Sequence, residues 1–149
     1  MDYLESARSW LAQDPDPVTR AELTELMETE SVAEITSRFS QRLEFGTAGL
    51  RGELGAGPNR MNRIVVAQTA KGLAEFLNQN HDTYQDRAGK LSVVIGYDGR
   101  VNSDIFARDS AEILQASGIQ TFLFDRAVPT PVAAFTGRRM SSSATIVVT

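Results

Sequence analysis

Apolar residues recur at helical spacing along the first forty residues. Three stretches show this spacing, and their apolar members are Leu4, Ala7, Leu11 and Ala12, then Ala21, Leu23, Leu26 and Met27, then Val32, Ile35 and Phe39. The run "DPDP" separates the first two stretches, and Pro17 behind Asp16 suits the first turn of a helix. Ser31 with Glu34 three residues later is a capping-box pattern. We therefore expect an N-terminal helical arm.

Beyond residue 62 the pattern alternates between helices and strands. Asn62 is placed to cap a long helix whose apolar positions run from Ile64 to Leu77. Strands are expected at "VVI" (93–95), "IQTFLF" (119–124) and "ATIVVT" (144–149). Helices are expected between them, one ending near Gly118 and one over "PTPVAAFTGRR" (129–139). This order predicts a layered α/β sheet with right-handed crossovers and helices on its faces.

Composition narrows the functional classes. The 149 residues are 42% hydrophobic and 23% charged, which is ordinary for a globular protein. A net charge of −4 without a basic stripe argues against nucleic-acid binding. The chain has no cysteine, which excludes disulfides, thiolate metal sites and a cysteine nucleophile. With no signal-peptide pattern and no apolar run of about 20 residues, we expect a cytoplasmic protein without membrane contact.

The stretch "LEFGTAGLRGELGAGPNRMNR" (43–63) contains five glycines and three arginines. It matches neither the Walker A loop nor the dinucleotide-binding fingerprint. Glycine lets backbone N–H groups approach a ligand closely, so Gly49 is a candidate anion contact. Thr47 offers a hydroxyl, and Arg51 offers a planar charged fork suited to phosphate. From the residues alone, a glycine-rich turn that serves only packing is about equally well supported.

Other polar residues have simpler interpretations. Pro129 and Pro131 fix a rigid entry to the next helix because proline presets φ. The run Ser141–Ser143 has no adjacent base, so a plain loop is favoured over a nucleophile. His81, the only histidine, is expected in an exposed loop, and a lone histidine makes no metal site. Arg138 and Arg139 are expected at a solvated helix end.

Four short motifs follow one another along the chain: "FGTAGLRG" (45–52), "GAGPNRMN" (55–62), "GYDGR" (96–100) and "VPTP" (128–131). In this order they resemble the α-D-phosphohexomutases, most of all the branch with phosphoglucomutase-2 and phosphopentomutase-type members. The resemblance covers nearly the whole chain. It implies an α/β fold, a three-layer α/β/α sandwich with a mixed sheet, preceded by the helical arm at 1–42.

The resemblance also implies a reaction and roles for residues. In this family an enzyme phosphoserine passes its phosphoryl group to a sugar monophosphate, and the resulting bisphosphate reorients before it returns the other phosphate. Arg51 would contact the bisphosphorylated sugar or the phosphoserine, with Thr47 and the backbone near Gly49 beside it. The residues expected to support the catalytic loop are Asp98, Arg100 and Thr130. Asp98 and Arg100 are expected to pair with each other or to support that loop rather than to touch substrate.

Residues 43–149 would then be the family's first domain, truncated just before the catalytic loop. The phosphoserine is expected just beyond Thr149, so no catalytic residue and no metal ligand is expected in this chain. The resemblance implies Mg²⁺, hexose 1,6-bisphosphate as activator and intermediate, a phosphorylated sugar substrate, and domains II–IV as partners. We expect part of a phosphoglucomutase or phosphomannomutase that is inactive alone. The alternative is a naturally short, noncatalytic module that binds sugar phosphates.

Overall fold

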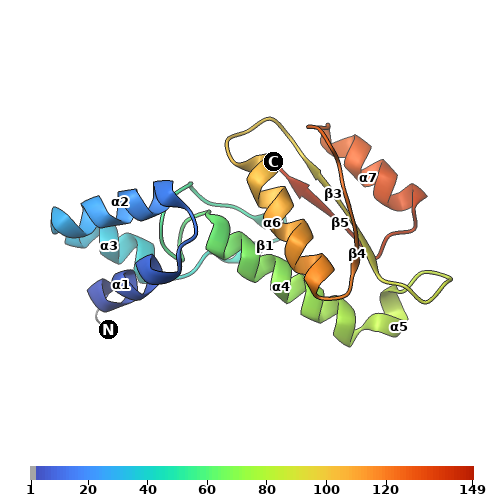
Figure 1. Cartoon of the computed structure of the whole chain (residues 1–149), viewed down its shortest axis with the longest axis horizontal. Coiled ribbons are helices and arrows are strands. Elements are labelled where there is room, and N and C mark those ends of the chain that lie inside the picture. Colours follow the sequence, from blue (N-terminus) through green and yellow to red (C-terminus); the bar gives the residue numbers. More distant parts are fainter. Residues whose placement is uncertain (1–2) are drawn as a thin grey trace. The chain divides into compact units, whose positions relative to one another are not determined.

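The computed structural model describes residues 3–149, which divide into two compact units between Val65 and Val66 (Figure 1). The first unit groups residues 43–65 with the helical arm. The predicted limit at residue 42 concerns the family domain rather than these compact units, and it stays a prediction.

The first unit is built from short helices followed by a small hairpin. Its elements are α1 (Tyr3–Gln13), α2 (Pro17–Glu28), α3 (Val32–Phe39), β1 (Phe45–Gly46) and β2 (Gly49–Leu50). Pro17 opens α2 as predicted, and the Asp16 carboxylate accepts the Val18 N–H at 2.9 Å as its cap. The predicted capping box is wrong in one respect. Ser31 stands at the N-cap of α3 but makes no side-chain cap bond, because its hydroxyl lies 3.0 Å from Thr29 Oγ1.

The core of the first unit joins the helices to the glycine-rich stretch. Its buried members are Ala7, Trp10, Leu23, Ile35, Phe39, Ala56 and Val65. Trp10 and Phe39 meet edge to face with their ring centroids 6.0 Å apart. Ala56 is fully buried, so part of the glycine-rich stretch packs in the core.

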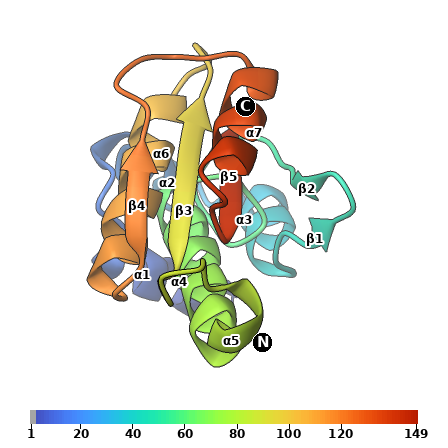
Figure 2. The same ribbon diagram turned by 90° about the vertical axis from the view of Figure 1, so that its right-hand side faces the viewer.

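The second unit is the layered α/β part of the chain. Its elements are the rest of α4 (Arg63–Gln79), α5 (His81–Tyr84), β3 (Ser92–Tyr97), α6 (Ser103–Ala116), β4 (Gln120–Leu123), α7 (Thr130–Arg139) and β5 (Ala144–Val148). The three strands form a parallel sheet in the order β4-β3-β5, with α6 and α7 on opposite faces (Figures 1 and 2). The predicted α/β fold is confirmed, with the antiparallel pairing in a separate sheet formed by β1 and β2.

The central strand β3 is buried on both faces, as its apolar run predicts. Val93 and Ile95 join α4 and α6 in one cluster with Leu77, Leu114 and other buried residues. On the other face, a Cβ built on Gly96 would lie 2.5 Å from the Ala133 Cβ of α7. The absence of a side chain at Gly96 therefore sets how closely α7 approaches the sheet.

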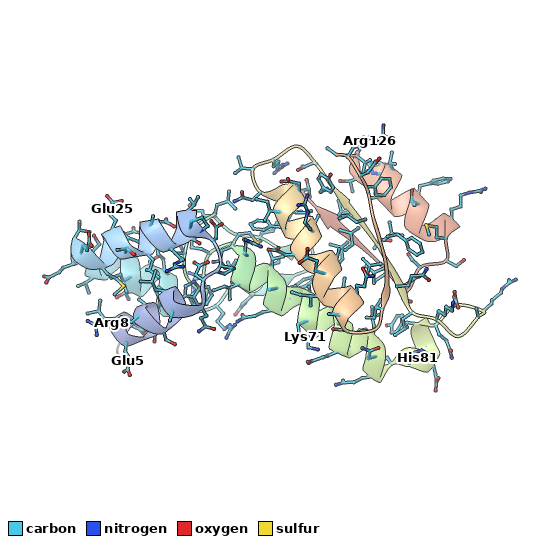
Figure 3. All side chains as sticks on the ribbon, in the orientation of Figure 1. Glu5, Arg8, Glu25, Lys71, His81 and Arg126 are labelled. Atoms are coloured by element: carbon cyan, nitrogen blue, oxygen red, sulfur yellow. The ribbon has the colours of Figure 1, made fainter. Side chains whose placement is uncertain are left out.

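The structure contradicts one of the simpler interpretations and confirms another. His81 begins the short helix α5 rather than lying in a loop, so that prediction is wrong (Figure 3). Its side chain is 43% exposed, and the helix forms because the backbone N–H groups of Thr83 and Tyr84 donate to the Asn80 carbonyl. Ser143 lies in a loop as predicted, where its hydroxyl donates to the Tyr84 carbonyl and accepts the Ser92 N–H.

Among residues 3–149, no helix combines the length and apolarity needed to cross a bilayer.

Candidate functional site

The residues predicted to bind phosphate lie on the hairpin of the first unit. Phe45 pairs with Leu50 and Gly46 with Gly49, which leaves Thr47 and Ala48 at the turn. Gly49 has φ +88°, a conformation that strains residues carrying a Cβ. Thr47 and Ala48 are exposed, and Phe45 is 73% exposed although it is aromatic. The turn of the hairpin therefore exposes its backbone groups and the Thr47 hydroxyl to solvent.

Arg51 follows the hairpin directly. Its Nε–H donates to the Ala48 carbonyl across the turn at 3.2 Å, which ties the guanidinium to the hairpin. The side chain is exposed, and within residues 3–149 it forms no ion pair with a carboxylate. One edge of the guanidinium is thus fixed, while its terminal nitrogens retain donors for an anion. This arrangement fits a phosphate contact.

The second glycine motif, "GAGPNRMN", is a folded loop organised by a buried amide. Asn62 is 2% exposed, and its Nδ2 donates to the carbonyls of Gly55 and Gly57 at 2.8 Å each. Its Oδ1 accepts the Val65 N–H at 3.0 Å, which confirms the predicted cap of α4. Gly57 has φ +105° and lies against Arg38, so both conformation and space favour glycine there.

In the second unit, Asp98 lies at the carboxyl end of β3, where parallel sheets commonly bind ligands. Its Oδ1 accepts bonds from the Arg100 N–H and the Ser103 hydroxyl, each at 3.0 Å. Its Oδ2 accepts the Thr149 hydroxyl at 2.8 Å and lies 3.0 Å from Arg100 Nε. The predicted pairing of Asp98 with Arg100 is confirmed. Asp98 also connects the ends of β3 and β5, since its own N–H donates to the Val148 carbonyl.

These bonds stabilise the ionised form of Asp98. The backbone N–H of Arg100 is the largest cause that lowers the pKa of this carboxyl below its ordinary 3.8, and the Thr149 and Ser103 hydroxyls and the Arg100 charge add to it. Partial desolvation acts in the opposite direction. The N-cap residue of α6 is Asn102, which has φ +65°. The Asp98 carboxylate stabilises the turn that leads into this helix. Asp98 thus acts here as a structural anion.

Thr130 stands in the first turn of α7, behind the N-cap residue Pro129. The Val128 N–H donates to the Tyr97 carbonyl at 2.8 Å, which fixes this entry to the end of β3. Within the described residues, no hydrogen bond or ion pair joins Thr130 to Asp98. The neighbouring loop after β4 carries an exposed pair, in which Arg126 Nε lies 3.1 Å from the Asp125 carboxylate (Figure 3).

The structure thus gathers the predicted residues in two places. Thr47, Gly49 and Arg51 come together on the hairpin of the first unit, and Asp98 and Arg100 come together at the sheet edge of the second. The sequence reasoning missed Ser103 and Thr149 as partners of Asp98. It also missed Glu22 and Arg38, which bind the loop around Ala56. Only the position of Ser103 at the start of a helix gave a signal.

The Mg²⁺ implied by the family resemblance does not fit the residues present. Within residues 3–149, no three histidine or acidic side chains gather where they could hold a metal ion. No chemical step is therefore derived through a metal bound to this chain.

Comparison with known proteins bears on these motifs directly. The family model described as phosphoglucomutase/phosphomannomutase, alpha/beta/alpha domain I, matches residues 42–149. This range includes the hairpin, the Asn62 loop and the whole sheet. No solved structure matches the chain.

Curated relatives agree with the family model. A probable phosphoribomutase of Schizosaccharomyces pombe is 39% identical over 94% of this chain and 23% of its own length. A phosphopentomutase of Mus musculus is 33% identical over 94% of the chain and 23% of its own length. A probable phosphomannomutase of Haemophilus influenzae is 46% identical over 60% of the chain and 17% of its own length. The chain spans less than a quarter of the length of these relatives. It belongs to the phosphoglucomutase/phosphomannomutase family, whose α/β/α domain I matches its residues 42–149.

Proposed function

We propose that this chain serves as the first domain of a phosphosugar mutase and that Arg51 contacts a phosphoryl group of the sugar or of the enzyme. The exposed guanidinium of Arg51, held by one nitrogen and without an ion-pair partner in the described residues, is the observation that carries the proposal. Phosphoryl transfer depends mainly on positioning and on stabilising charge that develops on oxygen. A fixed cation beside glycine backbone and a hydroxyl supplies both.

In finer terms, the proposed reaction interconverts a hexose 1-phosphate and its 6-phosphate through a phosphoserine and a hexose 1,6-bisphosphate. The phosphoserine and the Mg²⁺ ligands belong, in this proposal, to the rest of the protein. Asp98, Arg100 and Thr130 would support the catalytic loop from the carboxyl edge of the sheet. The network around Asp98 supports this role, since it already connects the ends of β3 and β5.

A pentose phosphate is the second candidate substrate. The relatives that align with 94% of this chain include proteins named probable phosphoribomutase and phosphopentomutase. Another such relative, from Homo sapiens, is named glucose 1,6-bisphosphate synthase and is 30% identical. These names place both sugar classes among the relatives. The two are separated by comparing kcat/KM for glucose 1-phosphate, mannose 1-phosphate and ribose 1-phosphate on the native protein.

A noncatalytic sugar-phosphate-binding module is the alternative function. Intact mass of the native protein and a phosphopeptide map separate it from the mutase. A mass well above 16.3 kDa with phosphate on a serine supports the mutase. A mass equal to that of this chain, without phosphoserine, would support the module instead.

The direct test is Arg51→Ala in the native protein. Removing a donor that stabilises transition-state charge lowers kcat by roughly 100- to 1,000-fold. Arg51→Lys keeps the charge but loses the planar fork, so we expect it to recover only part of the activity. Arg139→Ala is the matched control, because it removes another exposed arginine, at the end of α7. Turnover by Arg51→Ala equal to that of the control would overturn the proposed role.

A further inference from the structure

The loop at Gly55–Gly57 is bound by an ion pair that comes from two different helices. Glu22 of α2 and Arg38 of α3 lie 2.8 Å apart, measured between Oε1 and Nη1. Glu22 Oε2 accepts the Ala56 N–H at 2.9 Å, and Arg38 Nη1 donates to the Ala56 carbonyl at 3.3 Å. Both backbone groups of one buried residue are therefore satisfied by the two members of the pair.

The backbone of this loop lies directly on Arg38. A Cβ on Gly55 would lie 2.9 Å from Arg38 Nη1, and one on Gly57 would lie 3.0 Å from the Arg38 Cβ. The Arg38 carbonyl also accepts the Asn59 N–H at 3.0 Å. The Arg38 side chain is only 11% exposed, so the ion pair is partly desolvated and more sensitive to the loss of one partner than a surface pair.

The same loop holds both ends of the Arg51 hairpin. On the entering side, the Leu43 N–H donates to the Pro58 carbonyl at 3.0 Å. On the leaving side, the Met61 N–H donates to the Glu53 carbonyl at 2.7 Å. Residues 43 and 53 flank the hairpin, so the position of the loop fixes where the hairpin begins and ends. The chain of contacts runs from the ion pair to Ala56, from there to residues 58–61, and then to the hairpin.

We infer that Glu22 and Arg38 are positioning residues for Arg51, so that the helical arm sets the geometry of the phosphate contact. The inference rests on the proposed function for the role of Arg51, but not for the contacts themselves. Reactive geometry is sensitive to displacement, and a shift of about 1 Å costs up to roughly 100-fold in rate. A positioning ion pair should therefore influence turnover without touching substrate.

The test combines variants at Glu22 and at Arg51 in the native enzyme. We expect Glu22→Ala to lower kcat/KM for the preferred sugar 1-phosphate by roughly tenfold or more, and to change it little in an Arg51→Ala background. Glu22→Gln keeps an oxygen that accepts the Ala56 N–H, so it should retain more activity than Glu22→Ala. Glu34→Ala is the matched control, since Glu34 pairs with Arg38 at 3.4 Å and, among the described residues, forms no hydrogen bond or ion pair with the loop.

Equal losses from Glu22→Ala in both backgrounds would overturn the inference, because they would indicate a general structural defect. No loss in either background would also overturn it. If the native protein shows no mutase activity, the proposed function fails separately, and amide hydrogen exchange then decides the inference. Faster exchange at Ala56 and Met61 in Glu22→Ala than in Glu34→Ala would support the positioning role, and equal exchange would refute it. Should Glu22→Ala fail to fold, Glu22→Gln and Arg38→Lys provide the same comparisons.

Discussion

Replacing Gly96 by alanine tests how α7 is fixed on the sheet. Gly96 lies in β3 one residue before Tyr97, and its missing side chain leaves room for Ala133 of α7. A Cβ at this position would lie 2.5 Å from the Ala133 Cβ and 3.2 Å from Val128 Cγ2. Carbon atoms pack favourably at about 3.5–4.0 Å, so α7 would have to retreat by roughly 1 Å. Because α7 begins at the carboxyl edge of the sheet, the shift would also move Thr130.

The expected loss of stability follows from overpacking between β3 and α7. Extra methyl groups in a packed core cost about 1–3 kcal/mol of unfolding free energy, and we expect the upper end because a helix backbone must move. For a unit of this size, that corresponds to a fall of roughly 10–20 °C in Tm. Adding Ala133→Gly removes the other Cβ and should restore most of the loss. About 1 kcal/mol would remain, since glycine is unfavourable inside a helix.

Urea denaturation followed by circular dichroism measures these differences as shifts in the midpoint. Gly72→Ala is the matched control, because a Cβ there meets nothing within 4 Å and the residue lies inside α4. That substitution should raise stability by roughly 0.5–1 kcal/mol. A Gly96→Ala protein as stable as wild type would refute the reasoning, as would a double variant no more stable than Gly96→Ala alone.

Three further outcomes are expected. Asn62→Ala removes the cap of α4 and leaves the carbonyls of the Gly55–Gly57 loop unbonded. It should therefore lower the free energy of unfolding, measured by urea denaturation, by about 2–4 kcal/mol. A loss below about 1 kcal/mol would contradict this expectation. The lowered pKa of Asp98 means that its stabilisation is fully present above its ordinary value of 3.8 and is lost as the pH falls through the lowered value. Wild type should therefore lose stability relative to Asp98→Asn as the pH falls below 3.8. A pH-independent difference between the two proteins would refute that assignment. Thr47→Val should leave Tm unchanged, since Thr47 is exposed, but raise KM for a sugar phosphate several-fold, and an unchanged KM would exclude Thr47 from the phosphate contact.

Local signals in the sequence predicted most of the secondary structure. Pro17 behind Asp16, and Asn62 before an apolar period, each supply a capping interaction within four residues. The apolar runs of β3, β4 and β5 are long enough to identify strands, and Gly118 with φ +83° follows the end of α6 as expected. These features depend on neighbours in the chain, so a single sequence contains the necessary information.

The predictions that failed concern features that a local sequence pattern does not determine. The Ser31 capping box failed because the hydroxyl of Thr29 offered a competing partner, which the motif does not register. The hairpin β1–β2 and the helix α5 are too short to produce a periodic pattern. The strand order, with β3 between β4 and β5, followed only from pairing in three dimensions.

The sequence by itself determined the residue types of the candidate site, namely the glycines and Arg51 of the hairpin and the Asp98–Arg100 pair. Tertiary structure alone decided what holds them. Glu22 reaches Ala56 across 34 positions of the chain, and Thr149 reaches Asp98 across 51. Contacts over such separations leave no local pattern, because they depend on how helices and strands pack after each has formed. The sequence therefore specifies the donors and acceptors, and packing decides which of them meet.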